Sequence, residues 1–197
     1  MEVTFYWFAW SLTIIAIFFI QRRKLKRDLL LILGVFMCTY DMLSWSQIGQ
    51  VYFHVFILVF FGTYLFISIS RAWFDYFWPF IFSIGYAAVC LFLIVHPVWV
   101  NFPGISLFLL VIVSLLRVFI NDIGGQIGLW MLTNAGGTFF SFLIFSLYQN
   151  EGLIDTHVML SLSIKGVFVL LLFHGVGQLK RSIRKKRKSI SKGAAFV

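Results

Sequence analysis

Seven apolar stretches, separated by short polar breaks, constrain this chain more than any other feature of its sequence. Each is close to the roughly 20 residues that a helix needs to cross the hydrocarbon core of a bilayer. The predicted spans are 3–20, 29–45, 51–68, 77–95, 105–120, 128–148 and 158–178. Because seven spans leave little room for a soluble domain, the sequence predicts an all-α bundle of seven transmembrane helices.

The composition agrees with a membrane protein. The 197 residues are 61% hydrophobic and 12% charged, whereas soluble domains have about 45–50% apolar and 25% charged residues. Phenylalanine alone accounts for 25 residues, which lipid accepts at little cost. The two cysteines, Cys38 and Cys90, lie inside apolar stretches. We therefore expect neither a disulfide nor a cysteine metal motif.

Nearly all basic residues fall on one side of the membrane when the predicted spans are threaded through it. Five lie between the first two spans, at 22–27, and eight lie in the C-terminal tail, at 180–192. The alternate loops, near 46–50, 96–103 and 149–157, contain no lysine or arginine. Because basic loops stay on the cytoplasmic side, we expect the N-terminus outside and the C-terminus inside.

The polar breaks also predict where the helices end. We expect a cytoplasmic loop at 21–28, a tight outer turn at 46–50, a short inner loop at 70–75 and an inner turn at 121–126. The chain then divides into a seven-helix transmembrane domain, 1–179, and a basic cytoplasmic tail, 180–197.

The tail accounts for nearly all of the excess positive charge. It carries eight positive charges, and the net charge of the whole chain is +9. The high charge is therefore no sign of nucleic-acid binding. Basic runs beside a span contact anionic lipid head groups, and a short amphipathic helix would suit that role. The expected lipid-contacting residues are Lys180, Arg181, Arg184, Lys185, Lys186, Arg187 and Lys188.

Ionisable side chains inside a membrane are costly and call for an explanation. Asp41 lies in the outer half of the second predicted span, and Lys165 lies at similar depth in the seventh. An ion pair between them would remove two isolated charges from lipid. The simplest interpretation is a structural pair that fixes helix register, and the alternative is a proton-linked or substrate-linked site.

Histidines are the other intramembrane candidates. His54 continues a polar stripe that begins at Gln47 and Gln50, near the outer surface. His96 and His157 fall at the same side in the predicted topology. Three imidazoles could bind a transition metal, but no two of these histidines have close ligand spacing. We therefore expect local hydrogen bonds and no metal or other cofactor.

Two further polar positions stand out. Arg117 in the fifth span either pairs with Asp122 or Asp75, or extends its side chain to the cytoplasmic interface. Asn134 lies in the sixth span among small residues. One of its neighbouring stripes, Thr133, Gly137 and Ser141, has the spacing that lets helices approach closely. Helix packing is the simpler interpretation of this region, and a cavity lined by Asn134 is the functional one.

Enzyme signatures are missing from the sequence. It contains no GxSxG, HExxH or GxGD motif. The glycine-rich stretch 124–128 lacks the lysine and the hydroxyl residue that a phosphate-binding loop requires. No catalytic residue is therefore predicted.

The opening Phe5-Tyr6-Trp7-Phe8-Ala9-Trp10, the basic run 22–27 and the overall length and hydropathy resemble the YphA-like membrane proteins. The resemblance implies a bacterial inner-membrane location and carries over no functional residues.

Two hypotheses about function follow. The first is a non-enzymatic membrane protein that acts in assembly or regulation, packing against a membrane partner or a second copy of itself. The alternative is a small-solute or proton-coupled transporter with a polar site around Asp41, Lys165 and Asn134.

Overall fold

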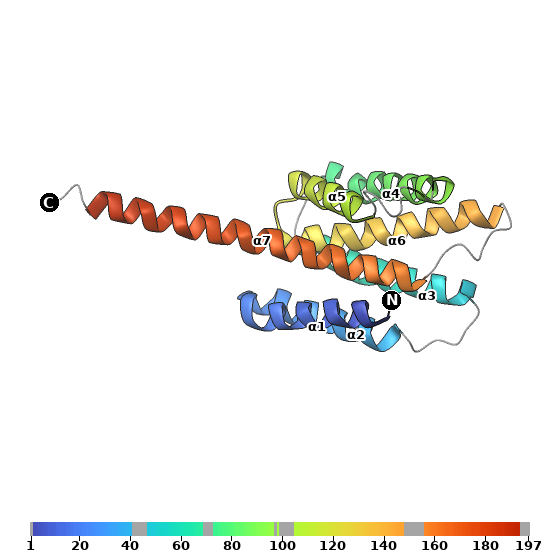
Figure 1. Ribbon diagram of the computed structural model, residues 1–197, viewed down its shortest axis with the longest axis horizontal. Coiled ribbons are helices and arrows are strands. Elements are labelled where there is room, and N and C mark those ends of the chain that lie inside the picture. The colour runs from blue at the N-terminus through green and yellow to red at the C-terminus, as the bar shows by residue number, and fades with distance from the viewer. Residues whose placement is uncertain are drawn as a thin grey trace.

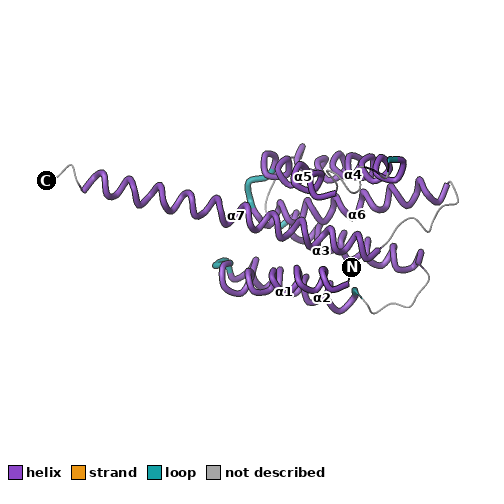
Figure 2. The backbone as a smooth tube through the Cα atoms, viewed as in Figure 1, coloured by secondary structure: helices purple, strands orange, loops and turns teal. Residues whose placement is uncertain are grey.

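The structure is an all-helical bundle (Figures 1 and 2). This computed structural model describes residues 2–40, 47–68, 73–96, 98, 105–147 and 156–193, and over those residues it contains no strand. The helices are α1 (Glu2–Phe19), α2 (Arg23–Thr39), α3 (Gln47–Ile67), the short 3-10 helix η1 (Trp73–Phe77), α4 (Trp78–Val95), α5 (Ile105–Phe119), α6 (Ile123–Leu147) and α7 (Thr156–Gly193).

The helices lie roughly antiparallel and form layers (Figure 1). The α1–α2 hairpin makes one layer, and the α4–α5 pair makes the layer on the opposite side. Between them lie α3, α6 and α7. Helix α6 packs against α3, α4, α5 and α7, whereas α1 packs mainly against α2 and α7. Helix α6 is therefore the centre of the bundle.

The burial of α6 agrees with this central position. Its fully buried side chains include Trp130 and Asn134, each 0% exposed. The outward faces of α1 and α4 instead expose large apolar residues, such as Trp7 and Phe80. In a soluble protein such surfaces would be unusual, but on a membrane protein they face lipid.

Four helical segments are long and apolar enough to cross a membrane: Gly49–Ile67, Trp73–Val95, Ile123–Leu147 and His157–Arg184. Val3–Phe19 and Phe108–Phe119 are shorter apolar helices. Each predicted apolar stretch thus overlaps a helix of the described residues, but α2 ends at Thr39, and residues 41–45 of the second predicted span lie outside the description. Helix α2 differs from the others because it starts with a run of basic residues.

The predicted loop at 21–28 is wrong. Helix α2 already begins at Arg23, so most of the basic cluster forms its first two turns. Lysine and arginine are good helix formers, and their long side chains reach past the helix end to polar groups. Lys26 shows this, because its Nζ donates to the carbonyl oxygen of Ile17 at 2.6 Å. That carbonyl belongs to the last turn of α1, where carbonyls lack helical partners.

Two helices also begin inside predicted turns. The outer turn was predicted at 46–50, but α3 begins at Gln47. The inner turn was predicted at 121–126, but α6 begins at Ile123. There, Asp122 Oδ2 accepts a hydrogen bond from the Gly125 backbone N–H at 2.5 Å. A carboxylate just before a helix satisfies one of its unpaired N–H groups, which allows α6 to start early.

The boundary between the predicted domains, at 179/180, is not a structural break. Helix α7 runs for 38 residues, from Thr156 to Gly193, and continues past the end of the bundle (Figure 1). Neither proline nor glycine interrupts 179–192, and the lysine and arginine residues there favour helix. The basic tail is therefore an extension of the last helix. We call the part from Leu179 to Gly193 the α7 extension.

Candidate functional site: the polar contact between α6 and α7

Asn134 of α6 is hydrogen-bonded to the neighbouring helix α7. Its Nδ2 donates to Ser163 Oγ at 2.6 Å and lies 3.4 Å from the Met159 carbonyl oxygen. Ser163 Oγ in turn donates to the same carbonyl oxygen at 3.0 Å. Asn134 and Ser163 are both 0% exposed. Interhelical hydrogen bonds of this kind fix how two membrane helices align.

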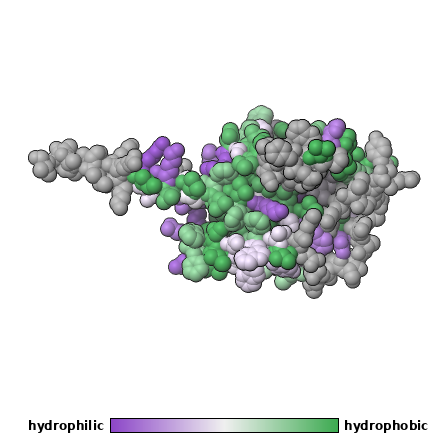
Figure 3. Space-filling view, viewed as in Figure 1, coloured by the Kyte–Doolittle hydropathy of each residue, from purple (hydrophilic) through white to green (hydrophobic). Residues whose placement is uncertain are grey.

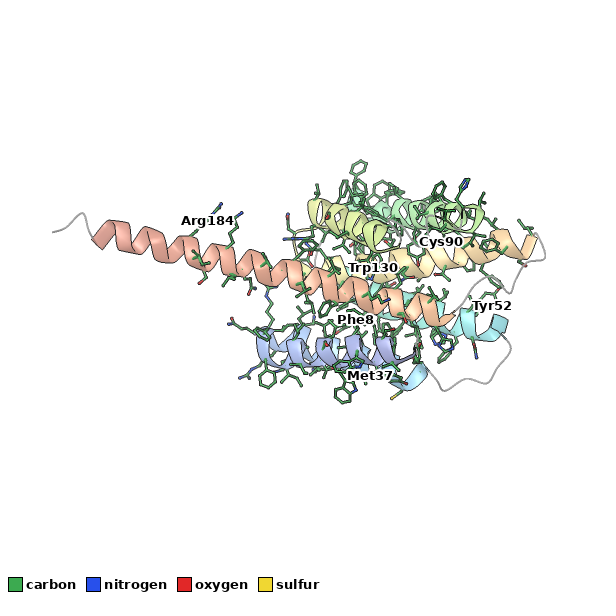
Figure 4. All side chains as sticks on the ribbon, viewed as in Figure 1. Phe8, Met37, Tyr52, Cys90, Trp130 and Arg184 are labelled. Carbon is green, nitrogen blue, oxygen red and sulfur yellow. The ribbon has the colours of Figure 1, made fainter. Side chains whose placement is uncertain are left out.

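A second bond joins the same two helices one turn away. The indole Nε1 of Trp130 donates to the Ser163 carbonyl oxygen at 2.9 Å, and Figure 4 shows Trp130 between α6 and α7. The ring lies where a side chain on Gly166 would be, because a Cβ there would overlap the indole. The glycine thus provides the space for the tryptophan. We call Trp130, Asn134 and Ser163 the α6–α7 clasp.

Close approach of backbones holds α6 against α3. A Cβ on Gly128 would lie 2.7 Å from the Phe66 nitrogen and 2.8 Å from the Gly62 carbonyl oxygen. Both atoms belong to the backbone of α3 and cannot rotate away. Gly137 of α6 packs against the side chain of Tyr86 of α4, which a Cβ there would overlap. The packing interpretation of the small-residue stripe in this helix therefore agrees with the structure.

Lys165 lies on α7 and faces the α1–α2 hairpin. Its side chain is half-buried, and its Nζ lies 5.9 Å from the centre of the Phe8 ring of α1. Phe8 also contacts Phe168, one turn along α7, with ring centres 5.3 Å apart. Asp41 lies outside the described residues. The Asp41–Lys165 ion pair therefore stays a prediction.

The histidines make local contacts. His54 is buried, and its Nδ1 lies 2.8 Å from the Gln50 carbonyl oxygen, which is the kind of bond that was expected. The His157 ring packs on Tyr40 with centres 4.7 Å apart. His96, at the end of α4, packs on Phe92 at 4.8 Å. In the described part of the chain, no group of three histidine, cysteine or acidic residues could hold a metal ion.

Arg117 has a contact that the sequence did not suggest. It is exposed, and its guanidinium carbon lies 5.2 Å from the centre of the Phe173 ring of α7. A cation over an aromatic face is attracted by the negative charge of the ring face. The arginine therefore links α5 to α7 near the end of the bundle from which the α7 extension leaves.

Sequence reasoning missed three polar residues. Trp130 and Ser163 were not singled out, although a tryptophan in mid-span needs a partner for its N–H group. Asp28 was assigned to a loop, but it is only 8% exposed. Its Oδ1 lies 3.5 Å from Arg27 Nε, and its Oδ2 accepts a bond from the Tyr64 hydroxyl at 3.4 Å. The leucines that follow Asp28 were the signal of its burial.

The α7 extension carries the predicted lipid-contacting residues. Lys180 and Arg184 are exposed on it, and Figure 4 shows Arg184 well away from the bundle. The backbone of Arg181, Lys185, Lys186, Arg187 and Lys188 is helical, whereas their side chains lie outside the described part of the structure. Hydrophilic surface gathers where α7 leaves the bundle, next to a mainly apolar face (Figure 3).

Residues 1–195 match the family described as YphA-like integral membrane protein. The chain belongs to this family. The match covers nearly the whole YphA-like chain, and it confirms the resemblance seen in the aromatic opening and the basic run. No curated protein and no solved structure matches the chain.

Proposed function

We propose that this integral membrane protein is a seven-span protein of the cell membrane, with its N-terminus outside and its C-terminus in the cytoplasm. Support comes from the basic residues, which cluster at the α1–α2 connection and on the α7 extension. Both lie at the same end of the bundle in Figure 1. The shortest α-helix in the described part of the chain, α5, has 15 residues, about 23 Å at 1.5 Å per residue. Local thinning of the bilayer accommodates such a length.

We further propose that the protein acts through helix packing, as a non-enzymatic assembly or regulatory component. The α6–α7 clasp is the observation that supports this role. The amide nitrogen of Asn134 and the indole N–H of Trp130 both donate to α7, so these groups serve the contact between helices. A transport site would instead present polar groups to a path for water or solute. Asn134 is fully buried.

The transporter hypothesis keeps one specific observation in its favour. Among the described residues, Asn134 Oδ1 has no hydrogen-bond partner although it is buried. Lys165 on the same helix pair is half-buried. A polar group of a substrate could donate a hydrogen bond to that oxygen.

Flux measurements separate the two functions. The full chain is reconstituted in liposomes that contain a pH-sensitive dye, and proton flux is driven by a pH gradient. We expect no flux above that of empty liposomes. Lys165→Met should leave this baseline unchanged, whereas Asn134→Leu should lower the thermal stability. Proton flux that Lys165→Met abolishes would support the transporter and contradict the packing role.

The state of assembly tests the packing role directly. Single-molecule photobleaching of the labelled protein in native membrane nanodiscs counts the copies in each disc. A fixed number of two or more copies, or a constant second membrane protein in the same disc, supports assembly. Single copies without a partner contradict it.

Topology is tested by labelling a single cysteine from outside intact cells. A cysteine placed in the 149–157 loop, in a chain without Cys38 and Cys90, should react with a membrane-impermeant maleimide. A matched cysteine at Ser189 should react only after lysis. The opposite pattern would overturn the orientation.

A further inference from the structure

Helix α7 carries two glycines just before it leaves the bundle, and packing does not require either. At Gly166, further back, a Cβ would overlap the ring of Trp130. At Gly175 a Cβ would meet nothing within 4 Å. At Gly177 it would meet only Arg117 Nη2, at 3.8 Å, which is an ordinary contact. An alanine would therefore fit at both Gly175 and Gly177.

Glycines without a packing role weaken a helix. Glycine loses more backbone freedom than alanine on entering a helix, so each one disfavours the helical state by about fivefold relative to alanine. Two of them within three residues make 175–177 the point at which α7 bends most readily. This point lies next to Leu179, where the α7 extension starts.

The α7 extension has an apolar stripe and a basic face. At about 100° per residue, Leu179, Ile183 and Ile190 fall within about 40° of one another. Seven of its eight basic residues fall within an arc of about 160° on the other side, and Lys186 lies beside the stripe. Helices with this distribution lie in the head-group region, with the apolar side towards the acyl chains.

If α7 stayed straight, most of the apolar stripe and of the basic face would lie too far from the membrane to contact it. At 1.5 Å per residue, the 38 residues of α7 span about 57 Å, but the hydrocarbon core is only about 30 Å thick. The α7 extension would reach about 22 Å beyond Leu179, whereas attraction to a charged surface falls off within about 8 Å at physiological salt. Leu179 and Ile183, 63% and 49% exposed, would reach only the head groups, and Ile190, about 16 Å beyond Leu179, would stay in water.

We propose that α7 bends at Gly175–Gly177, and that the α7 extension lies on an anionic lipid surface with Leu179, Ile183 and Ile190 inserted. The inference rests on the proposed orientation only for the leaflet involved, which is the cytoplasmic one. The bend brings the basic face within reach of the lipid phosphates, and the stripe leaves water at the same time.

Spin labels at two positions on opposite faces of the helix report the position of the α7 extension. Ile190→Cys and Lys188→Cys, on opposite faces of the helix, are labelled in the full chain without Cys38 and Cys90. The protein is placed in nanodiscs of phosphatidylcholine, with or without phosphatidylglycerol. We expect the oxygen-to-nickel accessibility ratio at 190 to rise at least fivefold with phosphatidylglycerol, while the label at 188 stays aqueous. Equal values at 190 in the two lipids, or an aqueous label at 190 in both, would overturn the proposal.

A double variant tests the bend at Gly175–Gly177, which we call the hinge. Gly175→Ala combined with Gly177→Ala should shift the equilibrium from bent to straight by roughly 25-fold, and the label at 190 should return to water. Gly85→Ala is the matched control, because a Cβ there also meets nothing within 4 Å, and it should leave the label inserted. If the double variant keeps the label inserted, the hinge is wrong. Nanodiscs expose both leaflets, so this result does not depend on the orientation that the cell-labelling experiment tests.

Discussion

Replacing Gly128 with alanine should loosen the centre of the bundle. The new methyl group would lie 2.7 Å from the Phe66 nitrogen and 2.8 Å from the Gly62 carbonyl oxygen. Ordinary contacts begin at 3.4 Å, so the helix axes must separate by about 0.7 Å. Overpacking of this kind costs about 1–3 kcal/mol, and the better helix propensity of alanine returns up to about 1 kcal/mol. The expected net loss of unfolding free energy is about 1–2 kcal/mol.

Gly85→Ala is the matched comparison for this prediction. It makes the same chemical change on α4, where the methyl group meets nothing within 4 Å. It should therefore raise stability, by up to about 1 kcal/mol. Reversible unfolding in mixed micelles with a denaturing detergent gives both free energies. If the two variants are equally stable, the close approach of α3 and α6 does not limit the packing, and the reasoning fails.

Three other experiments test the polar contacts. In a double-mutant cycle, Asn134→Leu and Ser163→Ala should show a coupling free energy of about 0.6–1.7 kcal/mol, and purely additive effects would contradict the hydrogen bond. Trp130→Phe keeps the ring but removes the N–H donor, so it should cost about 1 kcal/mol of unfolding free energy; unchanged stability in thermal melts would contradict the bond to Ser163. Tyr64→Phe should cost less than about 1 kcal/mol, because its 3.4 Å bond to Asp28 is long and only partly buried, and a larger loss would show that Asp28 depends on Tyr64.

Hydropathy located the helices but not their ends. The apolar stretches marked the bodies of the α-helices in the described part of the chain, because length and composition decide what lipid accepts. The starts of two helices, α2 at Arg23 and α3 at Gln47, were misjudged. At both places charged or amide side chains adjoin the apolar stretch, and no helix-breaking residue separates them from it. Such residues mark the edge of the membrane and not the edge of the helix, and only propensity and capping distinguish the two.

The polar contacts were harder to predict than the helices. Asn134 was recognised as a candidate, but its partner Ser163 is 29 residues away on another helix. Helical periodicity shows which residues share a face of one helix, but it does not show which face of a second helix lies opposite. The packing of Trp130 against Gly166 was missed for the same reason. Contacts of this type depend on the rotation of both helices, which a single sequence does not specify.

The central position of α6 has a consequence for biosynthesis. Helices α3 and α4 both pack on α6, yet α6 ends at Leu147, well after Val95 at the end of α4. At about 5–20 residues per second, a ribosome needs roughly 3–10 s to make the intervening chain. During that time α3 and α4 reside in the membrane, or beside the insertion machinery, with the surfaces that α6 will cover still open. The part of the bundle built from α3, α4 and α6 therefore forms late in synthesis, when α6 reaches helices that were made before it.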